Sequence, residues 1–543
     1  MALFEPAGLS PAFVLPAAFV SPQPVGILRW ATAGYLSGTD DDPANTLWEP
    51  RLLDDVRISQ SAVDAIGIGG LLPVGLADIG LADADGALAD LDRWSTADGR
   101  RASITAIPVE DARASDVGTP LAGRAHGMRL SFLTGLAEIA RTDPVPVFVG
   151  ITSRVDRDGR RNAMLRLVDV VEQLAVPLQP NKYLGTGGLE GGEELEDKPK
   201  PVLLGFGENV EPIALGDIDL GVGIGPLATY QFHWRAASEV VAVRIRGVVQ
   251  TLVGGTPTVG QARAFADQGL VQLGGTADGS VRVDARGDAV GGYVSSTPGV
   301  LRRLAQSLGP QLGSNDFDDV SFAFAENDLG GEIGWYQGAE ETTASQAAER
   351  IVGGCGAILC GARRGLLRLV DPLASDIDQF TLGHYDIIAC DPLEMPAALK
   401  PLPRAVGIGF RPNWSPLDDA AGVVTAADRQ RFRNDQSGPA RATSPTITKL
   451  VAQQRDLLFA GLYASRVDAL ARAQTWRAFL AAGPRLFQVT TDRYLHVIET
   501  GHIGRIAYPA WGLDAGARVS VLGWDEWVAA RRLTLTVVTL PEV

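Results

Sequence analysis

Residues 145–170 read VPVFVGITSRVDRDGRRNAMLRLVDV, and this stretch decides the fold class. Apolar residues crowd both of its ends, and the polar run 154–160, with the dipeptide Asp158-Gly159, lies between them. An Asp-Gly pair between two apolar segments is typical of a β-hairpin, because glycine adopts the positive φ that a tight turn needs. We therefore predict two antiparallel strands, 145–152 and 163–170, within a β-barrel or sandwich.

Further strand and turn signals run along the whole chain. Glycine (63 residues) and proline (33 residues) recur throughout the sequence, which suits many short strands joined by turns. The second predicted hairpin covers 239–252, and the third covers 270–283 with its turn at Asp278-Gly279. Single strands are predicted at 26–32, 128–133, 364–370, 486–490, 519–523 and 532–539.

Helices are few. Thr297 is predicted to cap one of them, with Pro298 in the first helical position. Another is predicted from Thr342 or Thr343 to about 352, and a long one from 445 to 481 with a break near Gly461. The predicted fold class is β-dominated α+β, a multidomain chain with tail-tube-like β-barrel domains and smaller α/β modules.

The length of 543 residues exceeds one ordinary core and indicates three or four domains. Changes of composition suggest where the boundaries fall. We predict an extended, proline-rich N-terminal arm that packs on a neighbour (1–25), a β-barrel or sandwich domain (26–180), a connecting segment of little periodicity and a second β-rich domain (181–310), an α/β module (311–395), and a helix with a C-terminal β domain (396–543).

The composition excludes several classes of protein. Hydrophobic residues make up 46% and charged residues 21%, as in a folded domain. The net charge of −16 has the wrong sign for a protein that holds DNA tightly. Five prolines in residues 1–25 argue against a signal peptide, and no apolar run is long enough to cross a bilayer. We expect folding and assembly in a bacterial host cytoplasm, without stable membrane insertion.

Cysteine and histidine give no strong site. Three cysteines argue against a disulfide framework, and Cys355 and Cys360 lie in an apolar run without a nearby histidine, which indicates buried small residues. No two histidines have the helical spacing of a metal pair. His496 and His502 flank a predicted turn at 499–501 and could approach one another, although two separate histidines are the favoured interpretation. The remaining histidines are His126, His233 and His384.

Four short motifs resemble known sites and are interpreted as structure. Gly223 opens a dinucleotide-type glycine pattern, but Pro226 interrupts it and an extended segment follows. An aspartate-rich stretch, 83–92, has Leu81 where a calcium loop needs its first ligand. The tripeptide Arg286-Gly287-Asp288 is predicted to be a turn, and the acidic run 190–197 a solvated loop. We predict no catalytic residue, no cofactor site and no metal site.

One segment resembles a known family. Residues 177–191, PLQPNKYLGTGGLEG, are followed by 197–205, DKPKPVLLG, and then by Asn209, Val210 and Pro212. This order of residues resembles a segment of the tail tip and baseplate hub proteins of phages, prophages and gene-transfer-agent-like particles of alphaproteobacteria. The resemblance is specific because it joins several unusual residues in sequence.

Other stretches extend the resemblance over residues 30–540. They include 48–53, the run 322–369, and the C-terminal run 503–516, IGRIAYPAWGLDAG. The family has an acidic residue after the first glycine of that C-terminal run, where this chain has Arg505. This departure leaves the role of that position open.

The resemblance implies a virion protein of the tail tip, without enzymatic activity. Its implied role is a homotrimeric central hub subunit that closes the tail tube and docks tip or fibre proteins. The implied partners are the distal tail ring, tip or fibre proteins, and genomic DNA that passes through the channel without specific binding. Two alternatives stay open: a distal tail ring adaptor between tube and hub, and a carbohydrate-binding or carbohydrate-degrading tail protein, for which 10 tryptophans and 9 tyrosines supply aromatic rings.

Overall fold

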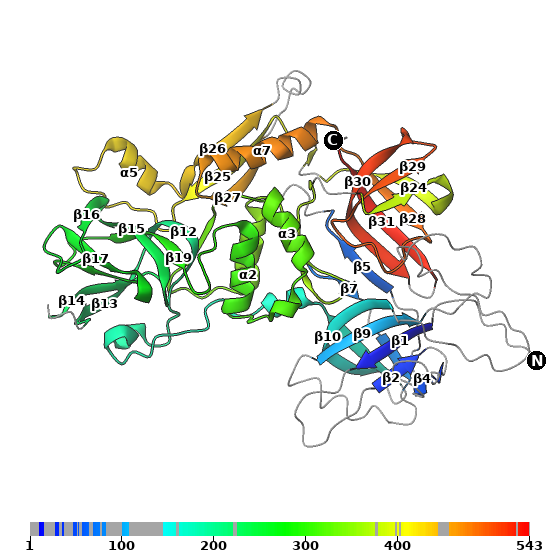
Figure 1. Ribbon diagram of the computed structural model, residues 1–543, viewed down its shortest axis with the longest axis horizontal. Coiled ribbons are helices and arrows are strands. Elements are labelled where there is room, and N and C mark those ends of the chain that lie inside the picture. Colours follow the sequence, from blue (N-terminus) through cyan, green and yellow to red (C-terminus); the bar gives the residue numbers. More distant parts are fainter. Residues whose placement is uncertain are drawn as a thin grey trace, which may run out of the picture.

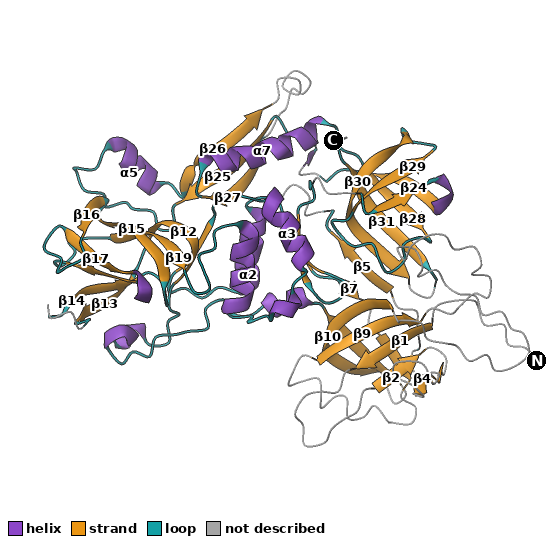
Figure 2. Ribbon diagram, viewed as in Figure 1, coloured by secondary structure: helices purple, strands orange, loops and turns teal. Residues whose placement is uncertain are grey.

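Strands dominate the computed structural model, and they form several separate sheets around a small helical centre (Figure 1, Figure 2). The structure therefore confirms the predicted fold class, β-dominated α+β with several units. The residues that the structure describes are 10–15, 28–31, 35–36, 47–50, 53, 57–63, 69–76, 79–82, 100–107, 145–158, 162–220, 225–374, 378–396, 399–400, 403–443, 456–527 and 530–541.

The first sheet holds the hairpin that the sequence predicts. Strands β10 and β11 pair antiparallel, with Asp158 opposite Asn162. Strand β1, which lies within the predicted N-terminal arm, pairs with β2 and β9 of the same chain, so this part of the arm belongs to the chain's own sheet. The order is β3 (Tyr35–Leu36), β4 (Leu47–Pro50), β2 (Leu28–Ala31), β1 (Ser10–Leu15), β9 (Arg100–Ile107), β10 (Val145–Asp158), β11 (Asn162–Val168) and β8 (Ile79–Ala82).

A second sheet of nine strands lies on the far side of the helices (Figure 1). The hairpin predicted at 239–252 is confirmed by the pairing of β15 with β16. The order is β13 (Ile213–Ile218), β14 (Leu227–Gln231), β18 (Leu270–Leu273), β17 (Gln261–Phe265), β16 (Val248–Leu252), β15 (Ala237–Ile245), β19 (Val281–Asp288), β12 (Val202–Val210) and β20 (Gly334–Gln337).

Two predictions for this region are wrong, the hairpin at 270–283 and the turn at 286–288. Strands β18 and β19 do not form a hairpin, because β18 pairs with β14 and β17 whereas β19 pairs with β15 and β12. The connecting segment of little periodicity contains two regular strands, β12 and β13. The tripeptide 286–288 ends strand β19 and is not a turn. Local turn residues gave the wrong partners because the pairing is set by long-range burial.

Three helices cover a small central sheet. Helix α4 (Ala344–Gly353) begins after Thr343, whose hydroxyl accepts a hydrogen bond from the N–H of Gln346, as the sequence predicts. Helix α2 (Thr297–Ser307) is capped by Ser296 instead of the predicted Thr297, with Pro298 in its first turn. The other elements are α3 (Asp319–Asp328), β22 (Leu367–Val370), β21 (Ile358–Gly361) and β6 (Gly70–Leu72).

The predicted long helix at 445–481 is wrong in its first half. Strand β27 (Leu457–Tyr463) pairs in parallel with β25 (Ala405–Pro412), and helix α7 (Arg466–Ala481) follows it. A Cβ on Gly461 would lie 2.3 Å from the backbone oxygen of Gly409, so glycine allows the two strands to approach. Residues 444–455 lie outside the described residues. Strand β26 (Gln436–Thr443) completes this sheet, and the short helix α5 (Ala426–Arg433) precedes it in the sequence.

The last sheet combines both ends of the chain. Strand β5 (Arg57–Ser61) pairs with β30, about 460 residues later in the sequence. The predicted strands at 486–490, 519–523 and 532–539 are confirmed. The sheet order is β23 (Phe380–Leu382), β29 (Ile503–Tyr508), β30 (Leu513–Trp527), β31 (Arg532–Thr539), β28 (Leu486–Thr491) and β24 (Ile387–Leu393), with β7 (Gly75–Leu76) beside β5.

The main hydrophobic core lies under the helices, between the large sheets. Trp476 of α7 is fully buried there, and its ring packs against Phe459 and Phe479. Gly356 has a φ of +72°, and a Cβ at this position would lie 2.6 Å from the Trp476 ring. The backbone turn and the close approach of the ring both require glycine. The domain boundaries predicted from composition stay predictions.

Candidate functional site

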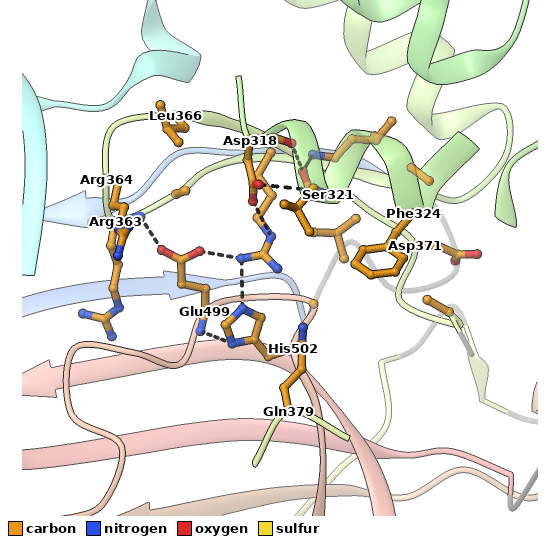
Figure 3. A pocket seen from close by; sticks show the side chains of 18 of the residues that line it. Asp318, Ser321, Phe324, Arg363, Arg364, Leu366, Asp371, Gln379, Glu499 and His502 are labelled. Atoms are coloured by element: carbon orange, nitrogen blue, oxygen red, sulfur yellow. Dashed lines mark hydrogen bonds and ion pairs between the residues drawn. The ribbon is translucent and has the colours of Figure 1, made fainter. Parts of the chain in front are cut away.

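A pocket of about 360 Å³ lies where the helical centre meets the last sheet (Figure 3). Helix α3 forms one wall, the hairpin β21–β22 forms the second, and the loop 496–502 before β29 forms the third. Figure 3 shows Arg364 and Phe324 on opposite sides of the pocket, with Glu499 and His502 between and below them. Residues far apart in the sequence therefore meet in one concave place.

Arg368 of β22 joins all three walls. Its Nη1 donates to Oε2 of Glu499 and lies 3.2 Å from Nε2 of His502, both on the loop before β29. Its Nε lies 3.7 Å from Oδ2 of Asp318, which precedes α3. The other oxygen of Glu499 accepts the backbone N–H of Arg363 at 2.7 Å. The centre of the pocket is therefore a charge-assisted network.

His502 is held in its neutral form. Burial lowers the pKa of His502 well below its usual value, and the nearby charges of Arg368 and Arg363 lower it further. A neutral imidazole has one lone pair on its ring nitrogens. It accepts either from Arg368 or from the backbone N–H of Glu499, which lies 3.3 Å from Nδ1. His502 is thus a hydrogen-bond acceptor in a fixed network and is poorly suited to gain a proton.

A second ionic layer lies behind the first. The side chain of Arg363 is buried, stacks at 3.6 Å on the Trp524 ring, and places Nη2 2.7 Å from Glu526. His496 forms a further ion pair with Glu526. Burial opposes the charge of Glu526, but Arg363 and His496 outweigh it and lower the pKa of this carboxyl to about 2. This layer ties β30 to the hairpin of the helical centre.

The N-terminal part of the chain enters the same junction. Gln60 of β5 donates to the carbonyl oxygens of Gly361 and Leu72, at 3.1 and 3.2 Å. Its own side-chain oxygen accepts from the hydroxyl of Thr500 at 2.7 Å. Nearby, Asp169 accepts the N–H of Val74 at 2.7 Å, and burial raises the pKa of its carboxyl to about 6. Three distant segments of the chain are thus fixed to each other here.

The pocket has a serine, but its hydroxyl serves the backbone. Ser321 donates to the carbonyl oxygen of Asp318 at 2.9 Å and accepts the N–H of Leu369 at 3.2 Å. A nucleophilic serine needs a base within hydrogen-bond distance of its hydroxyl. The bonds of Ser321 instead attach α3 to β22. Among the described residues, no side-chain base is recorded within hydrogen-bond distance of the Ser321 hydroxyl.

The rim of the pocket is more apolar than its floor. Val320 and Phe324, one turn apart on α3, are 64% and 42% exposed, and Val497, which also lines the pocket, is 45% exposed. Arg364 lies exposed at the end of the β21–β22 hairpin. A half-exposed aromatic ring beside a concave polar floor is a feature of binding sites.

The structure brings together two of the residues considered in the sequence. His496 and His502 line the same pocket, but they belong to different layers with different partners. The three cysteines are free and buried, as predicted for Cys355 and Cys360. Within the described residues, no group of three metal-ligating side chains is present. The aspartate-rich stretch 83–92 lies outside the described residues.

The remaining motifs have structural roles where they are described. Strand β14 follows the glycine pattern at Gly223, where the dinucleotide fingerprint needs a helix. Asp288 of the Arg-Gly-Asp tripeptide is buried and paired with Arg235 and Arg303. In the acidic run 190–197, Glu193, Glu194, Glu196 and Asp197 are exposed, as expected for a solvated loop, and Glu193–Leu195 forms a short 3-10 turn.

The sequence did not reveal Arg368 and Glu499 as site residues. The available signal was a charged residue inside the apolar strand 366–370, where an inward position demands a partner. The partner comes from a loop about 130 residues later, and no spacing rule connects the two.

None of the helices in the described part of the chain is long and apolar enough to cross a membrane.

No family model matches the sequence, and no curated protein is similar to it. Solved structures do match. The 43 kDa tail protein of prophage MuSo2 from Shewanella oneidensis is 10% identical with a TM-score of 0.35, and the match covers 97% of this chain and 98% of that chain. A tail protein from Neisseria meningitidis MC58 is 8% identical with a TM-score of 0.37, covering 98% and 96%.

A further match is to the virion of a native gene transfer agent particle. The identity is 12% and the TM-score 0.37, over 68% of this chain and 91% of that chain. With every TM-score below 0.5, these likenesses carry no argument about the role of this chain. The structural neighbours of the chain include a prophage tail protein, a tail protein and a gene transfer agent virion.

Proposed function

We propose that this chain is a structural protein of a phage-type tail, a central hub subunit at the tail tip. In this role it closes the tail tube and docks tip proteins or fibres, as a homotrimer, and it carries out no catalysis. The observation that carries the proposal is the use that the fold makes of the segment 177–212, on which the family resemblance rests.

In the structure, hydrogen bonds connect that segment to other parts of the chain. Leu178 donates its N–H to the carbonyl of Thr342 at 2.8 Å, just before α4. The side chain of Gln179 donates to the carbonyls of Lys200 and Gly338, at 2.9 and 2.6 Å. The hydroxyl of Tyr183 donates to Gln231 in the nine-stranded sheet. The unusual residues of this segment therefore connect sheets and helices, as a role in assembly requires.

The chemistry of the pocket favours the same role. Its carboxylates and guanidinium groups pair with each other across three walls, and its serine bonds to backbone. A catalytic site instead keeps reactive groups available to a substrate. Paired groups between separate parts of one chain stiffen the joint, which suits a subunit that holds its sheets in fixed positions.

The charge of the chain fits a channel wall. With a net charge of −16, the surface repels phosphate groups, so DNA can slide past without being held. Large sheets whose edges meet neighbouring subunits would form a ring with cyclic symmetry. Among the described residues, the exposed aromatic side chains lie on different parts of the chain, namely Phe324, Tyr385, Trp511 and Trp527, so they offer less support to a carbohydrate-binding protein.

The test is the symmetry and mass of the purified particle. Light scattering gives the mass, and averaged negative-stain images give the symmetry, both for the chain alone and with the tail-tube protein of the same particle. We expect a threefold ring with a central hole. A sixfold ring would replace the hub with the distal tail adaptor. A monomer that stays single with the tube protein would contradict both ring proposals and favour glycan-binding assays.

A further inference from the structure

We infer that the loop 181–199 of one copy of this chain, the docking loop, binds in a groove between β26 and α7 of a second copy, the α7 groove. The docking loop would place its exposed leucines on the apolar floor of the groove and its carboxylates beside the arginine at the rim. This inference deepens the proposed function, and it rests on that proposal for the expectation that copies of the chain assemble.

The α7 groove has a volume of about 530 Å³ and an uncharged floor on the helix side. After Asp468, helix α7 has only two charged residues, Arg472 and Arg477, and both are buried. Its exposed side chains in the groove are short or neutral, namely Gln474, Ala478 and Ala481. A surface helix normally has charged and polar residues on its outer face. This face is instead suited to close contact with apolar side chains of another protein.

The α7 groove also has an excess of positive charge. Arg441 of β26 is exposed at the rim and shares a single carboxylate, that of Asp456, with Arg404, and both ion pairs measure 3.3 Å. Arg477 lines the groove at 5% exposure, and among the described residues no ion pair is recorded for it. None of the described residues that line the groove is acidic. Three guanidinium groups are thus offset by one carboxylate.

The buried Arg477 acts through its charge, and the exposed Arg441 supplies the contact. The Nε and Nη2 of Arg477 have no hydrogen-bond partner among the described residues, and burial lowers the pKa of its guanidinium group. A buried charge without a counter-ion is costly, and a carboxylate nearby reduces this cost without touching the buried atoms. Arg441 can donate directly to that carboxylate. The groove therefore favours an acidic occupant.

The docking loop is fixed in its conformation. At its base, Tyr183 donates its N–H to the carbonyl of Lys198 at 2.9 Å and accepts the N–H of Asp197 on its own carbonyl at 3.0 Å. The hydroxyl of Tyr183 bonds to β14, and Leu195 is buried in an apolar cluster with residues of β13 and β18. A loop that is already ordered loses little conformational entropy when it binds.

The outer side of the docking loop combines apolar and acidic side chains. Leu184 and Leu189 are 64% and 41% exposed, beside a turn in which the N–H of Gly185 donates to the carbonyl of Glu190 at 3.0 Å. Burial of these leucines on a partner is favourable, since it removes apolar surface from water. Exposed carboxylates follow, and among the described residues no ion pair is recorded for them: Glu193, Glu194, Glu196 and Asp197.

A second copy of the chain is the favoured occupant of the α7 groove. With a net charge of −16, most of the chain repels the acidic docking loop, whereas the groove attracts it. Figure 1 shows α7 at the top of the view and β13, beside which the docking loop packs, at the lower left, so the two surfaces of one molecule lie apart. A contact between two different surfaces of identical chains is heterologous, and it can close into a ring.

The experiment is sedimentation velocity of the full chain alone, for which we expect a trimer. Ala478→Glu places a carboxylate in the groove and should weaken self-association by about tenfold or more, because it repels the acidic loop. Leu184→Ser/Leu189→Ser removes the apolar contact and should weaken self-association by a similar factor. The controls Ala427→Glu in α5 and Val423→Ser, at exposed positions outside the groove and the loop, should leave it unchanged.

Mixing the two variants tests whether the loop and the groove meet each other. The Ala478→Glu chain keeps an intact docking loop, and the Leu184→Ser/Leu189→Ser chain keeps an intact α7 groove. One working contact remains possible between them, so an equimolar mixture should form a complex of two chains and nothing larger. Circular dichroism verifies that each variant is folded, and this pairing could not arise if either variant were misfolded.

Three results would overturn the inference: a wild-type chain that stays monomeric alone, a trimer that both variants leave intact, or a mixture that does not pair. The hub role would stand in each case if a threefold ring formed with the tail-tube protein. Conversely, pairing of the variants without a threefold ring in the presence of that protein would support the contact and contradict the hub role. Failure of the inference and failure of the proposed function are therefore distinguishable.

Discussion

Helix α7 and the last sheet both join the helical centre, but they do so with a different balance of apolar and charged contacts. Under α7, the buried ring of Trp476 packs between Phe459 and Phe479, with centroid distances of 5.3 and 5.9 Å. At the last sheet, the buried side chains of Arg363 and Glu526 pair at 2.7 Å. The α7 junction combines this apolar contact with one buried ion pair, Arg472 with Asp371 at 2.6 Å, whereas the polar contacts dominate at the last sheet.

The difference teaches what each junction can contribute. Apolar burial stabilises in proportion to the area removed from water and does not depend on pH. A buried ion pair first loses the hydration of both charges, so it adds little net stability. Removal of one partner nevertheless destabilises the protein strongly, because the other charge is left buried and unpaired. The apolar junction therefore supplies stability, and the ionic junction fixes where the last sheet sits.

The largest effect is expected at the apolar junction. Trp476→Ala removes the largest fully buried side chain of the core and its hydrogen bond to the carbonyl of Cys355. We expect the free energy of unfolding to fall by about 4 kcal/mol, from lost transfer energy and the cavity left behind. Denaturant unfolding followed by circular dichroism measures the change.

The matched control lies on the same helix. Val467 of α7 is 74% exposed, so Val467→Ala should change the unfolding free energy by less than about 0.5 kcal/mol. If Trp476→Ala cost no more than this control, the apolar junction would not be the main source of stability. The comparison drawn between the two junctions would then be wrong.

The next effect concerns the ionic junction. Glu526→Gln leaves the buried Arg363 without its counter-ion, and we expect a loss of about 3 kcal/mol. The double variant Arg363→Met/Glu526→Leu should lose less than the single one, because it removes both buried charges. Denaturant unfolding gives both values, and hydrogen exchange shows whether strands β28–β31 open first.

The pH dependence of this pair has a defined sign. The pKa of Glu526 is about 2 in the folded chain, against an ordinary value of 4.5. Its contribution to the free energy of unfolding is therefore complete above pH 4.5 and is lost as the pH falls from 4.5 toward 2.

If the double variant Arg363→Met/Glu526→Leu were as unstable as Glu526→Gln, the unpaired charge would not be the cause of the loss.

Local patterns in the sequence predicted local structure. The hairpin of β10 and β11 follows from Asp158-Gly159, and the start of α4 follows from Thr343, because a turn and a cap depend on a few adjacent residues. Strand β27 was predicted as part of a helix. Its parallel partner β25 lies about 50 residues away, and a local sequence pattern does not show such a partner. Tertiary pairing overrode the local propensity there.

The site was predictable only in fragments. The sequence placed His496 and His502 near a turn, and the structure brings both to one pocket. Their partners, Glu526 and Arg368, come from β30 and β22, and no local pattern links such positions. Burial and long-range pairing decide these contacts, so a single sequence without the fold does not contain them in readable form.

The smallest effect is expected from the titration of His502. Its pKa is well below 6.5 in the folded chain, so below pH 6.5 the unfolded chain binds a proton that the folded chain does not. Stability therefore falls as the pH drops below 6.5, by at most about 1.4 kcal/mol per pH unit. His502→Gln keeps an acceptor for Arg368 and removes the titration.

We expect the stability of His502→Gln, relative to wild type, to improve by about 1 kcal/mol between pH 6.5 and 5.5. Asp169 acts in the opposite direction, because its pKa is raised to about 6, so its destabilising charge is lost on acidification. Asp169→Asn should therefore steepen the fall that His502→Gln flattens. Chemical denaturation across this pH range measures the free energy of unfolding of both variants. If the two variants showed the same dependence of this free energy on pH, neither His502 nor Asp169 would set the pH dependence of stability.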